Sequence, residues 1–484
     1  MALSIYNVLQ RQKVEFKPIE AGRVGLYVCG PTVQDYSHLG HGKTYVSFDV
    51  IVRWLRKSGY DVLYVQNITD VGHLLESGED RILKKANQLA AKPWQIVEHY
   101  ARHYFADMDA LGVQRPDISP RAGAHVPEQI KMIETLIAKE NAYVADGSVY
   151  FDVTSAPDYG KLSNRRVDQQ ESGTREAVRG EKRHPEDFAL WKRAEPEHIM
   201  RWDSPWGEGF PGWHIECSAM AKKYLGPTFD IHGGGVDNIF PHNESEIAQS
   251  ECANDAPFAN YWMLVGSLNV PDSMGIPTKM SKSLGNFVTI KDALANYRPE
   301  VIRTFVLSAH YTSPVTYSEE SMRGSQGGWE RLNNCVWLVR NRINSAPAGS
   351  DGNAFIERLD KARAAFTDAM NDDFSAPQAI AVLQELTRDV NTLVNGDAAV
   401  GIETLKAIDA LYTDLAGDVL GIIAPQQAGN ADADREAGLI QLLIEMRQAA
   451  RKAKNFAEAD RIRDELAGLG VILEDRADGT VWKV

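Results

Sequence analysis

The first apolar run of the chain, residues 24–28, is short and continuous, as in a strand that is buried on both faces. Residues 29–32 contain glycine and proline and predict a turn. From residue 44 to 58 the apolar side chains recur at helical spacing, and Gly59 then ends the predicted helix. Residues 61–68 predict the next strand. This order of strand, turn, helix and strand predicts an α/β fold with a Rossmann-like, doubly wound parallel sheet, which binds nucleotides at the carboxyl edge of its strands.

The rest of the sheet is expected to return after a long and more polar segment. Residues 1–118 form the first half of the predicted catalytic domain. Apolar runs at 229–231 and 261–270 place its second half at residues 206–345. Residues 119–205 are less regular, which is typical of a domain inserted between the two halves.

Two segments without large apolar residues, 345–353 and 424–432, carry turn-forming residues and are interpreted as linkers. Helical spacing between them predicts a helical bundle at residues 353–424. Residues 433–484 predict a small mixed C-terminal domain, with two helices followed by a hairpin at 471–482.

Composition and charge narrow the class of protein. The chain has 484 residues, too many for one core, and 44% of them are hydrophobic, so a folded multidomain protein is expected. Its net charge of −14 excludes a protein that coats nucleic acid non-specifically. A nucleic acid would have to bind at a local basic patch. Neither a secretory signal nor an apolar stretch of ~18 residues is found, so we expect a cytoplasmic protein that does not contact membranes. Thiols are reduced in that compartment, which favours metal binding over disulfides for paired cysteines.

Two short motifs carry the candidate phosphate chemistry. His38, Gly40 and His41 stand in a His-Leu-Gly-His motif after the first predicted strand, and Lys279 and Lys282 stand in a Lys-Met-Ser-Lys-Ser motif half a chain later. Imidazole donors at a helix N-terminus can orient the phosphates of ATP, and Gly40 lets the adenine ring approach. The two lysines can neutralise a leaving pyrophosphate, and Mg²⁺ is expected on the phosphates. Each motif alone is also typical of a turn or an exposed charged loop, but the two in this order predict an ATP site in which the histidines and lysines act in catalysis.

Four side chains of the types that bind zinc are scattered along the chain, namely Cys29, Cys217, His242 and Glu246. His242 and Glu246 are four residues apart, so on a helix they would face the same way. Buried single cysteines are also common core residues, and spacing alone therefore leaves a structural role open.

Together these motifs resemble the cysteinyl-tRNA synthetases, a family of class I aminoacyl-tRNA synthetases. The resemblance covers essentially the whole chain and rests on residues 29–32, 38–41, 212–218, 233–237, 240–242 with Glu246, and 279–283. It implies ATP-dependent activation of L-cysteine to cysteinyl adenylate and transfer to the 3′ end of tRNA(Cys). We expect ATP, L-cysteine and tRNA(Cys) as partners, and a monomer.

The resemblance also implies roles for individual side chains. One Zn²⁺ per chain would be held by the four candidate ligands, and the substrate thiolate would bind this metal directly. The amino-acid pocket would be lined by Thr69, Trp213, His232 and Asp237. Shape alone separates cysteine from serine by only about 10–200-fold, whereas a soft metal prefers a thiolate to an alcohol, so zinc would provide the selectivity.

Two features depart from the family pattern. The family commonly has a second histidine after the zinc-binding one, where this chain has Asn243. Because His242 and Glu246 are both present, we expect zinc still to bind, with a different side chain next to its ligands. Residues 270–278 make a longer lead into the lysine motif. Cys252 and Cys335 match no site and are interpreted as structural.

By the same resemblance, the C-terminal domain is expected to read the anticodon. Residues 446–454 contain basic but no acidic side chains, so Arg447 and Arg451 are candidate contacts to tRNA phosphates, although most such runs are solvated helix faces. Trp482 would stack on a base or cap a small core. Asp475 falls where the resemblance places an aspartate that contacts a base.

Two other functions stay open. A related ligase passes activated cysteine to an amino sugar in mycothiol synthesis, and it would share the catalytic half but lacks such a tail. A catalytically inactive paralogue that binds tRNA is the other alternative, and the intact histidines, lysines and zinc set argue against it.

Overall fold

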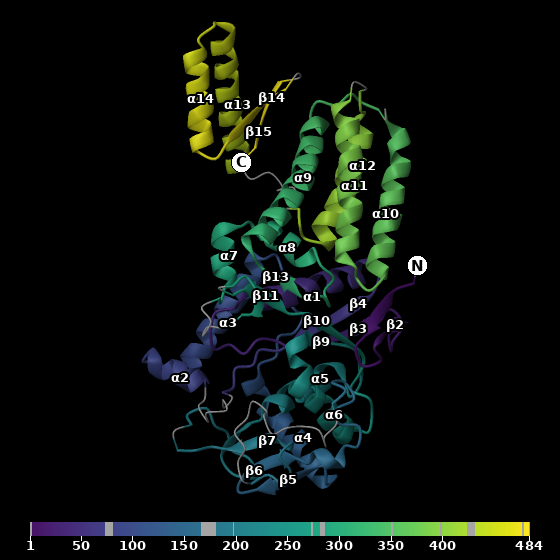
Figure 1. Cartoon of the computed structure of the whole chain (residues 1–484), viewed down its shortest axis with the longest axis vertical. Helices are drawn as coiled ribbons and strands as arrows, with labels where there is room; N and C mark the ends of the chain where they lie inside the picture. Colours follow the sequence, from purple (N-terminus) through teal and green to yellow (C-terminus); the bar gives the residue numbers. More distant parts are fainter. Residues whose placement is uncertain are drawn as a thin grey trace. The chain divides into compact units, whose positions relative to one another are not determined.

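The computed structural model describes residues 2–72, 81–165, 181–196, 198–272, 274–280, 286–349, 352–396, 399–423, 431–476 and 479–483. The chain forms two compact units, Met1–Ile423 and Ala424–Val484 (Figure 1). None of the helices in this described part has the length and apolar character needed to cross a membrane.

A four-stranded parallel sheet forms the centre of the first unit. In spatial order its strands are β10 (Ala259–Val265), β9 (Phe229–Gly235), β3 (Arg23–Val28) and β4 (Asp61–Gln66). Most side chains of these strands are buried, as expected for a parallel sheet covered on both faces. Leu26 faces Tyr64 on β4 and Ile231 on β9, so β3 lies between strands from both halves of the predicted catalytic domain. The doubly wound parallel sheet expected from the apolar pattern is therefore present.

Helix α1 (Leu39–Lys57) joins β3 to β4 and begins before residue 44, where its apolar pattern starts. His38 is its N-cap: the His38 ring accepts a hydrogen bond from the His41 backbone N–H, and the His41 ring accepts one from the His38 N–H. These two bonds satisfy donors that the start of a helix leaves unpaired. The early start was missed because side chains, not apolar spacing, provide the cap.

The segment after β4 carries helices and a second sheet. The helices are α2 (Arg81–Gln88), α3 (Pro93–Ala110) and α4 (Val126–Ala138). The sheet is antiparallel, with the order β5 (Ala142–Ala145), β6 (Ser148–Phe151), β7 (Phe188–Arg193) and β8 (Gly209–Pro211). The last strand lies beyond residue 205, where the inserted domain was expected to end. Helices α5 (Trp213–Leu225) and α6 (Glu244–Asn254) then flank β9 in the chain.

Helices dominate the remainder of the first unit, namely α7 (Ile290–Asn296), α8 (Pro299–Leu307), α9 (Glu319–Ile343), α10 (Ile356–Asn371), α11 (Ala376–Asn395) and α12 (Ile402–Tyr412). Short strands complete it: β1 (Ser4–Asn7) pairs with β2 (Gln12–Glu15), and β11 (Leu268–Pro271) pairs with β12 (Pro277–Lys279) and β13 (Val315–Thr316). Helix α9 precedes the bundle predicted at 353–424, yet it packs against α11 and α12. Figure 1 shows this bundle and the inserted sheet on opposite sides of the central sheet.

The second unit consists of α13 (Ala431–Lys452), α14 (Phe456–Gly468) and an antiparallel hairpin of β14 (Ile472–Arg476) and β15 (Gly479–Lys483). The two predicted helices and the hairpin are therefore present. Ile440, Ile444 and Ile462 form part of its small core, and Trp482 packs against this core. Of the two roles considered for Trp482, capping the core is the one that the structure displays.

A buried arginine links three parts of the first unit. The Arg303 guanidinium, on α8, pairs with Asp49 of α1 at 2.7 Å. It also donates to the carbonyl oxygens of Leu420, at the end of the bundle, and of Leu111 and Gly112, after α3. Burial lowers the pKa of Arg303, which the charge of Asp49 partly offsets. The Leu420 carbonyl accepts two hydrogen bonds from this guanidinium, and Arg303 therefore holds the end of the bundle to α1 and to the segment after α3.

Replacing Arg303 tests this link. Arg303→Met should lower the free energy of unfolding by about 3 kcal/mol, because the buried carbonyl of Leu420 loses its donor and Asp49 keeps only Arg53 as its charged partner. Urea unfolding followed by circular dichroism measures the change. Arg323→Met is the control, because Arg323 pairs with Glu319 on the exposed face of α9 and should contribute about 1 kcal/mol or less. Equal small losses in both variants would contradict the role of Arg303.

Candidate functional site

A cavity of about 730 Å³ opens beyond the carboxyl ends of β3, β4, β9 and β10. This is the edge at which doubly wound sheets bind their ligands. Its wall contains most of the predicted site residues that the structure describes: His38, Gly40, His41, Lys279, Thr69, Trp213, Asp237, Cys29, Cys217 and His242. Residues predicted separately for ATP, the amino acid and the metal therefore meet in one cavity.

The two motif histidines stand together at the start of α1. Their rings are stacked with centroids 3.9 Å apart. Burial, followed by the neighbouring His38, lowers the pKa of His41 well below its ordinary value. The His41 ring is therefore neutral at physiological pH and can offer a hydrogen bond without carrying charge. A Cβ at Gly40 would lie 2.8 Å from the His38 ring, so a larger residue there would displace this ring.

The lysine motif reaches the same cavity from β12. The Lys279 ammonium pairs with the Asp237 carboxylate at 2.7 Å, and both side chains are about half exposed. Lys282, the second predicted catalytic lysine, lies outside the described residues. Lys279, which is predicted to contact phosphates, is thus paired with Asp237, which is predicted to contact the amino acid.

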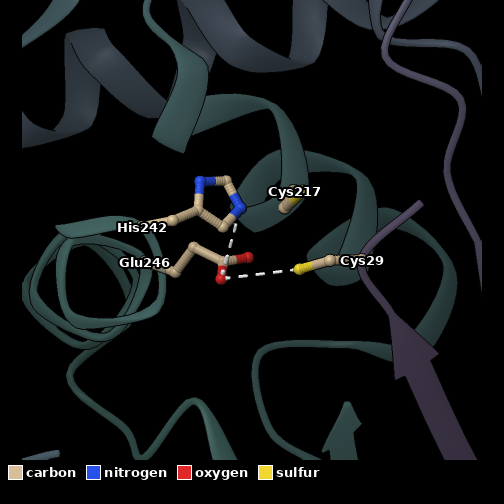
Figure 2. A group of neighbouring side chains, drawn as sticks. All are labelled: Cys29, Cys217, His242 and Glu246. Atoms are coloured by element: carbon tan, nitrogen blue, oxygen red, sulfur yellow. Dashed lines mark hydrogen bonds and ion pairs between the residues drawn. The ribbon is translucent and has the colours of Figure 1, made fainter. Parts of the chain in front are cut away.

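The four predicted metal ligands come together as a buried group (Figure 2). Their ligand atoms all lie within 4.8 Å of one another. Cys29 follows β3, Cys217 lies on α5, and His242 immediately precedes α6, which carries Glu246 in its first turn. Figure 2 shows the Cys29 sulfur and the Glu246 carboxylate facing each other, with Sγ 3.9 Å from Oε2. His242 Nε2 lies 3.6 Å from the same oxygen, so the expected common face of His242 and Glu246 is confirmed.

Mutual electrostatics set the protonation of this group. Burial opposes ionisation of Glu246, but the charges of His232 and His242 and two hydrogen bonds lower its pKa to about 2. Burial likewise opposes protonation of His242, but Glu246 and Cys217 raise its pKa to about 9. The hydrogen bond between the two thiols lowers the pKa of Cys217 and raises that of Cys29. At neutral pH the group therefore pairs a Glu246 carboxylate with a protonated His242.

This donor set fits zinc. Two sulfurs, one imidazole nitrogen and one carboxylate oxygen at this mutual spacing are typical of a tetrahedral zinc site. Metal binding would require a proton to leave His242, since only the neutral imidazole can coordinate, and affinity would then fall at low pH. A soft donor set of this kind disfavours Mg²⁺ and Ca²⁺, which prefer oxygen ligands.

Several supporting residues were not predicted. Asn67, at the end of β4, accepts a hydrogen bond from the Gly30 N–H at 2.7 Å and lies 3.7 Å from the Cys217 sulfur. The His214 and His242 rings share a hydrogen bond of 3.0 Å between their Nδ1 atoms. The available signal was a polar residue within a predicted strand or near a candidate ligand. Asn67 lies near the end of the strand predicted at 61–68, and His214 lies three positions before Cys217.

The predicted amino-acid pocket residues do not all occupy equivalent places. Thr69 and Trp213 line the cavity, and the Trp213 ring lies 4.3 Å from that of His242. His232 is not on the cavity wall. It lies fully buried behind Glu246, with Nε2 3.1 Å from Oε1, and its ring stacks on Trp262. Its position supports the Glu246 carboxylate directly.

The residues predicted to contact tRNA are largely engaged within the second unit. Arg447 is buried and makes two hydrogen bonds to Asp475, at 2.7 and 2.8 Å. Arg451 reaches the same carboxylate at 2.7 Å. The hydrogen bond from Arg447, opposed by partial burial and aided by Thr480, holds the pKa of Asp475 well below its usual range. These side chains join α13 to the terminal hairpin, and the basic run therefore contains fewer unpaired charges than its sequence suggests.

Three family models match successive parts of the chain. They are the tRNA synthetases class I (C) catalytic domain over residues 15–327, the DALR domain over 365–424, and the cysteinyl-tRNA ligase anticodon binding domain over 439–482. Among curated proteins, the chain is 50% identical to the cysteine–tRNA ligase of Deinococcus radiodurans, covering 99% of this chain and 96% of that protein. It is 48% identical to the cysteine–tRNA ligase of Chlorobium chlorochromatii, covering both chains completely.

Solved structures share the fold at much lower identity. A LeuRS from Agrobacterium radiobacter, in a ternary complex with tRNA and LeuAMS, matches with a TM-score of 0.60 and 13% identity, covering 84% of this chain and 85% of that one. A methionyl-tRNA synthetase of Mycobacterium tuberculosis matches with a TM-score of 0.57 and 14% identity, covering 82% and 91%. These neighbours share the fold of this chain. The full-length similarity to the curated ligases identifies the family within that fold. By its family models and its full-length curated relatives, the chain belongs to the cysteinyl-tRNA synthetases of class I.

Proposed function

We propose that this chain attaches L-cysteine to tRNA(Cys) in two steps, through cysteinyl adenylate. One observation carries the proposal: a single cavity joins the stacked motif histidines to a buried Cys-Cys-His-Glu group. The first element suits the phosphates of ATP, and the second suits the side chain of cysteine. The protein is proposed to act as a monomer in the cytoplasm, where tRNA is charged.

In the first step, a carboxylate oxygen of cysteine bonds to the α-phosphorus of ATP, and pyrophosphate leaves with the electrons of the broken P–O bond. The nucleophile is already ionised, so the protein needs no general base. Its contribution is orientation and charge compensation. His38 and His41 are proposed to donate hydrogen bonds to the phosphates, while Lys279, Lys282 and Mg²⁺ neutralise charge on the leaving group. Lys279 must leave Asp237 to do so, and phosphate oxygens have to compete with that carboxylate.

Selection of cysteine is proposed to depend on the buried group. A zinc ion held by Cys29, Cys217, His242 and Glu246 would supply a soft Lewis acid that prefers a thiolate to an alcohol. The surrounding side chains then limit the space: Trp213 covers His242, and Thr69 donates to Glu216 at 3.1 Å. Thr69, Trp213 and Asp237 are proposed to bind the amino acid directly, with His232 acting from behind Glu246.

The second step requires tRNA, and the C-terminal unit is proposed to bind its anticodon. The match of an anticodon binding domain to residues 439–482 supports this role and disfavours the amino-sugar ligase, which lacks such a tail. The assembled histidines and metal group disfavour an inactive paralogue. Arg451, which is half exposed although paired, remains the better candidate for a phosphate contact than the buried Arg447.

The proposal predicts that the purified chain exchanges pyrophosphate into ATP when cysteine is added, and that serine at the same concentration supports at least ~100-fold less exchange. It should then charge tRNA(Cys) but not a tRNA with another anticodon. Exchange without charging, together with cysteine transfer to an amino-sugar acceptor, would favour the mycothiol ligase. The absence of exchange would favour the inactive paralogue.

The lysine motif is tested with Lys282→Ala. Loss of one preorganised cation should slow cysteine-dependent pyrophosphate exchange about 100- to 1,000-fold, equivalent to ~3–4 kcal/mol of transition-state stabilisation. The KM for cysteine should change little, since this lysine is assigned to the phosphates. Lys291→Ala, an exposed lysine on α7, is the matched control and should retain full exchange. Normal exchange by the Lys282 variant would remove this residue from the mechanism.

The C-terminal unit is tested by a chain that ends at Ile423, the boundary between the two compact units. The truncated chain should fold and form cysteinyl adenylate at a near-normal rate, because every described residue of the cavity lies upstream. Transfer to tRNA should fall sharply through weaker binding and loss of anticodon preference. Binding by the full-length chain should weaken more steeply with salt than binding by the truncated chain, since phosphate contacts are lost. Equal charging with equal anticodon preference would contradict the role of the tail.

A further inference from the structure

In the sequence, Asn243 lies between His242 and Glu246, two of the four candidate metal ligands, and its side chain is completely buried. Its amide nitrogen donates to Glu246 Oε2 at 2.8 Å and to Cys29 Sγ at 3.8 Å. These ligands come from different elements, Glu246 from α6 and Cys29 from the turn after β3. One side-chain nitrogen therefore joins two ligand positions that are far apart in sequence.

The chemistry of an amide makes this arrangement possible. A single –NH₂ group has two N–H bonds on one atom and can donate to two acceptors at once, whereas the two nitrogens of an imidazole point in different directions. The orientation is set by charge, since a flipped amide would turn its carbonyl oxygen toward the Glu246 carboxylate and the Cys29 sulfur. Asn243 Oδ1 has no hydrogen-bond partner among the described residues, so the side chain is held there for its nitrogen.

The other carboxylate oxygen is held independently. His232 Nε2 lies 3.1 Å from Glu246 Oε1. With Oε1 engaged by His232, Oε2 is the oxygen that faces Cys29 and His242. The carboxylate is thus fixed in position and in rotation before any metal arrives, and Asn243 provides the constraint on the oxygen that faces the other ligands.

We propose that Asn243 is a positioning residue for the metal site, which holds Glu246 and Cys29 at coordinating distance and so strengthens metal binding. The inference rests on the proposed function in that zinc is the metal considered. It assigns Asn243 no contact with cysteine or ATP. Groups in this position that orient metal ligands typically change metal affinity about 10- to 100-fold when removed.

The test compares Asn243→Leu, which keeps the side-chain size but has no donor, with Asn243→His, which can donate from one ring nitrogen toward this side. Zinc affinity is measured on the full-length chain by competition with a chromophoric chelator, and Co²⁺ replaces zinc for absorption spectra of the thiolate-to-metal bands. Asn243→Leu should bind zinc about 10- to 100-fold more weakly and change the Co²⁺ spectrum. Asn243→His should fall between this variant and the wild type.

Asn254→Leu is the matched control, because Asn254 ends the same helix and its amide nitrogen has no hydrogen-bond partner in the described structure. It should retain wild-type zinc affinity, and thermal unfolding of all variants with excess zinc should show the same folded state. Unchanged zinc affinity in Asn243→Leu, or an equal loss in Asn254→Leu, would overturn the proposal. Failure of cysteine-dependent exchange by the zinc-loaded wild type would instead count against the proposed function, so the two failures are separable.

Discussion

The site depends on one close contact between two backbone segments. Gly30, in the turn after β3, lies so near the end of β4 that a Cβ at this position would stand 1.5 Å from the Asn67 carbonyl oxygen. Its N–H donates to the Asn67 side chain at 2.7 Å. Only glycine permits this approach, which carries the preceding Cys29 toward Cys217 and Glu246. The positions of Cys29 among the candidate metal ligands and of Thr69 in the cavity wall therefore depend on the close approach of the segments that follow β3 and β4.

The parallel sheet was predictable because its evidence is local. Residues 24–28 and 62–65 are continuous apolar runs, and a helix pattern lies between them, so the βαβ unit follows from periodicity alone. The ligand types were also visible, since Cys29, Cys217, His242 and Glu246 have the chemistry of a zinc set. Their assembly was not visible, because Cys29 and Glu246 are far apart in sequence, and the contacts that join them are made by Asn243 and by strand order.

What the pattern missed has a common physical cause. The start of α1 at Leu39 depends on reciprocal side-chain hydrogen bonds between His38 and His41, which leave no apolar signature. The basic run around Arg447 suggested a free cationic surface, but Asp475 pairs with it from a strand that follows later in the chain. In each case a specific polar contact determines the result, and hydrophobic periodicity does not report such contacts. The domain limits have a different cause, since α9 joins the bundle by packing against helices that follow it in the chain.

Charge is used in two different ways in this acidic chain. In the cavity, the pairing of Lys279 with Asp237 is half exposed, so solvent screens it and a ligand can exchange it. Around Arg303 the charges are buried, and removing this cation would leave Asp49 with Arg53 as its remaining charged partner. Asp49, the partner of Arg303, lies on α1, the helix whose N-terminus presents His38 and His41.

The carbonyl of Leu420, which accepts from the same guanidinium, lies just before Ile423, where the first unit ends. Gly421 is needed there, because its φ of +64° and the 2.6 Å from a Cβ to the Arg303 side chain both disfavour any other residue. The helix that carries the phosphate motif is thus tied, through one buried cation, to the point from which the C-terminal unit departs.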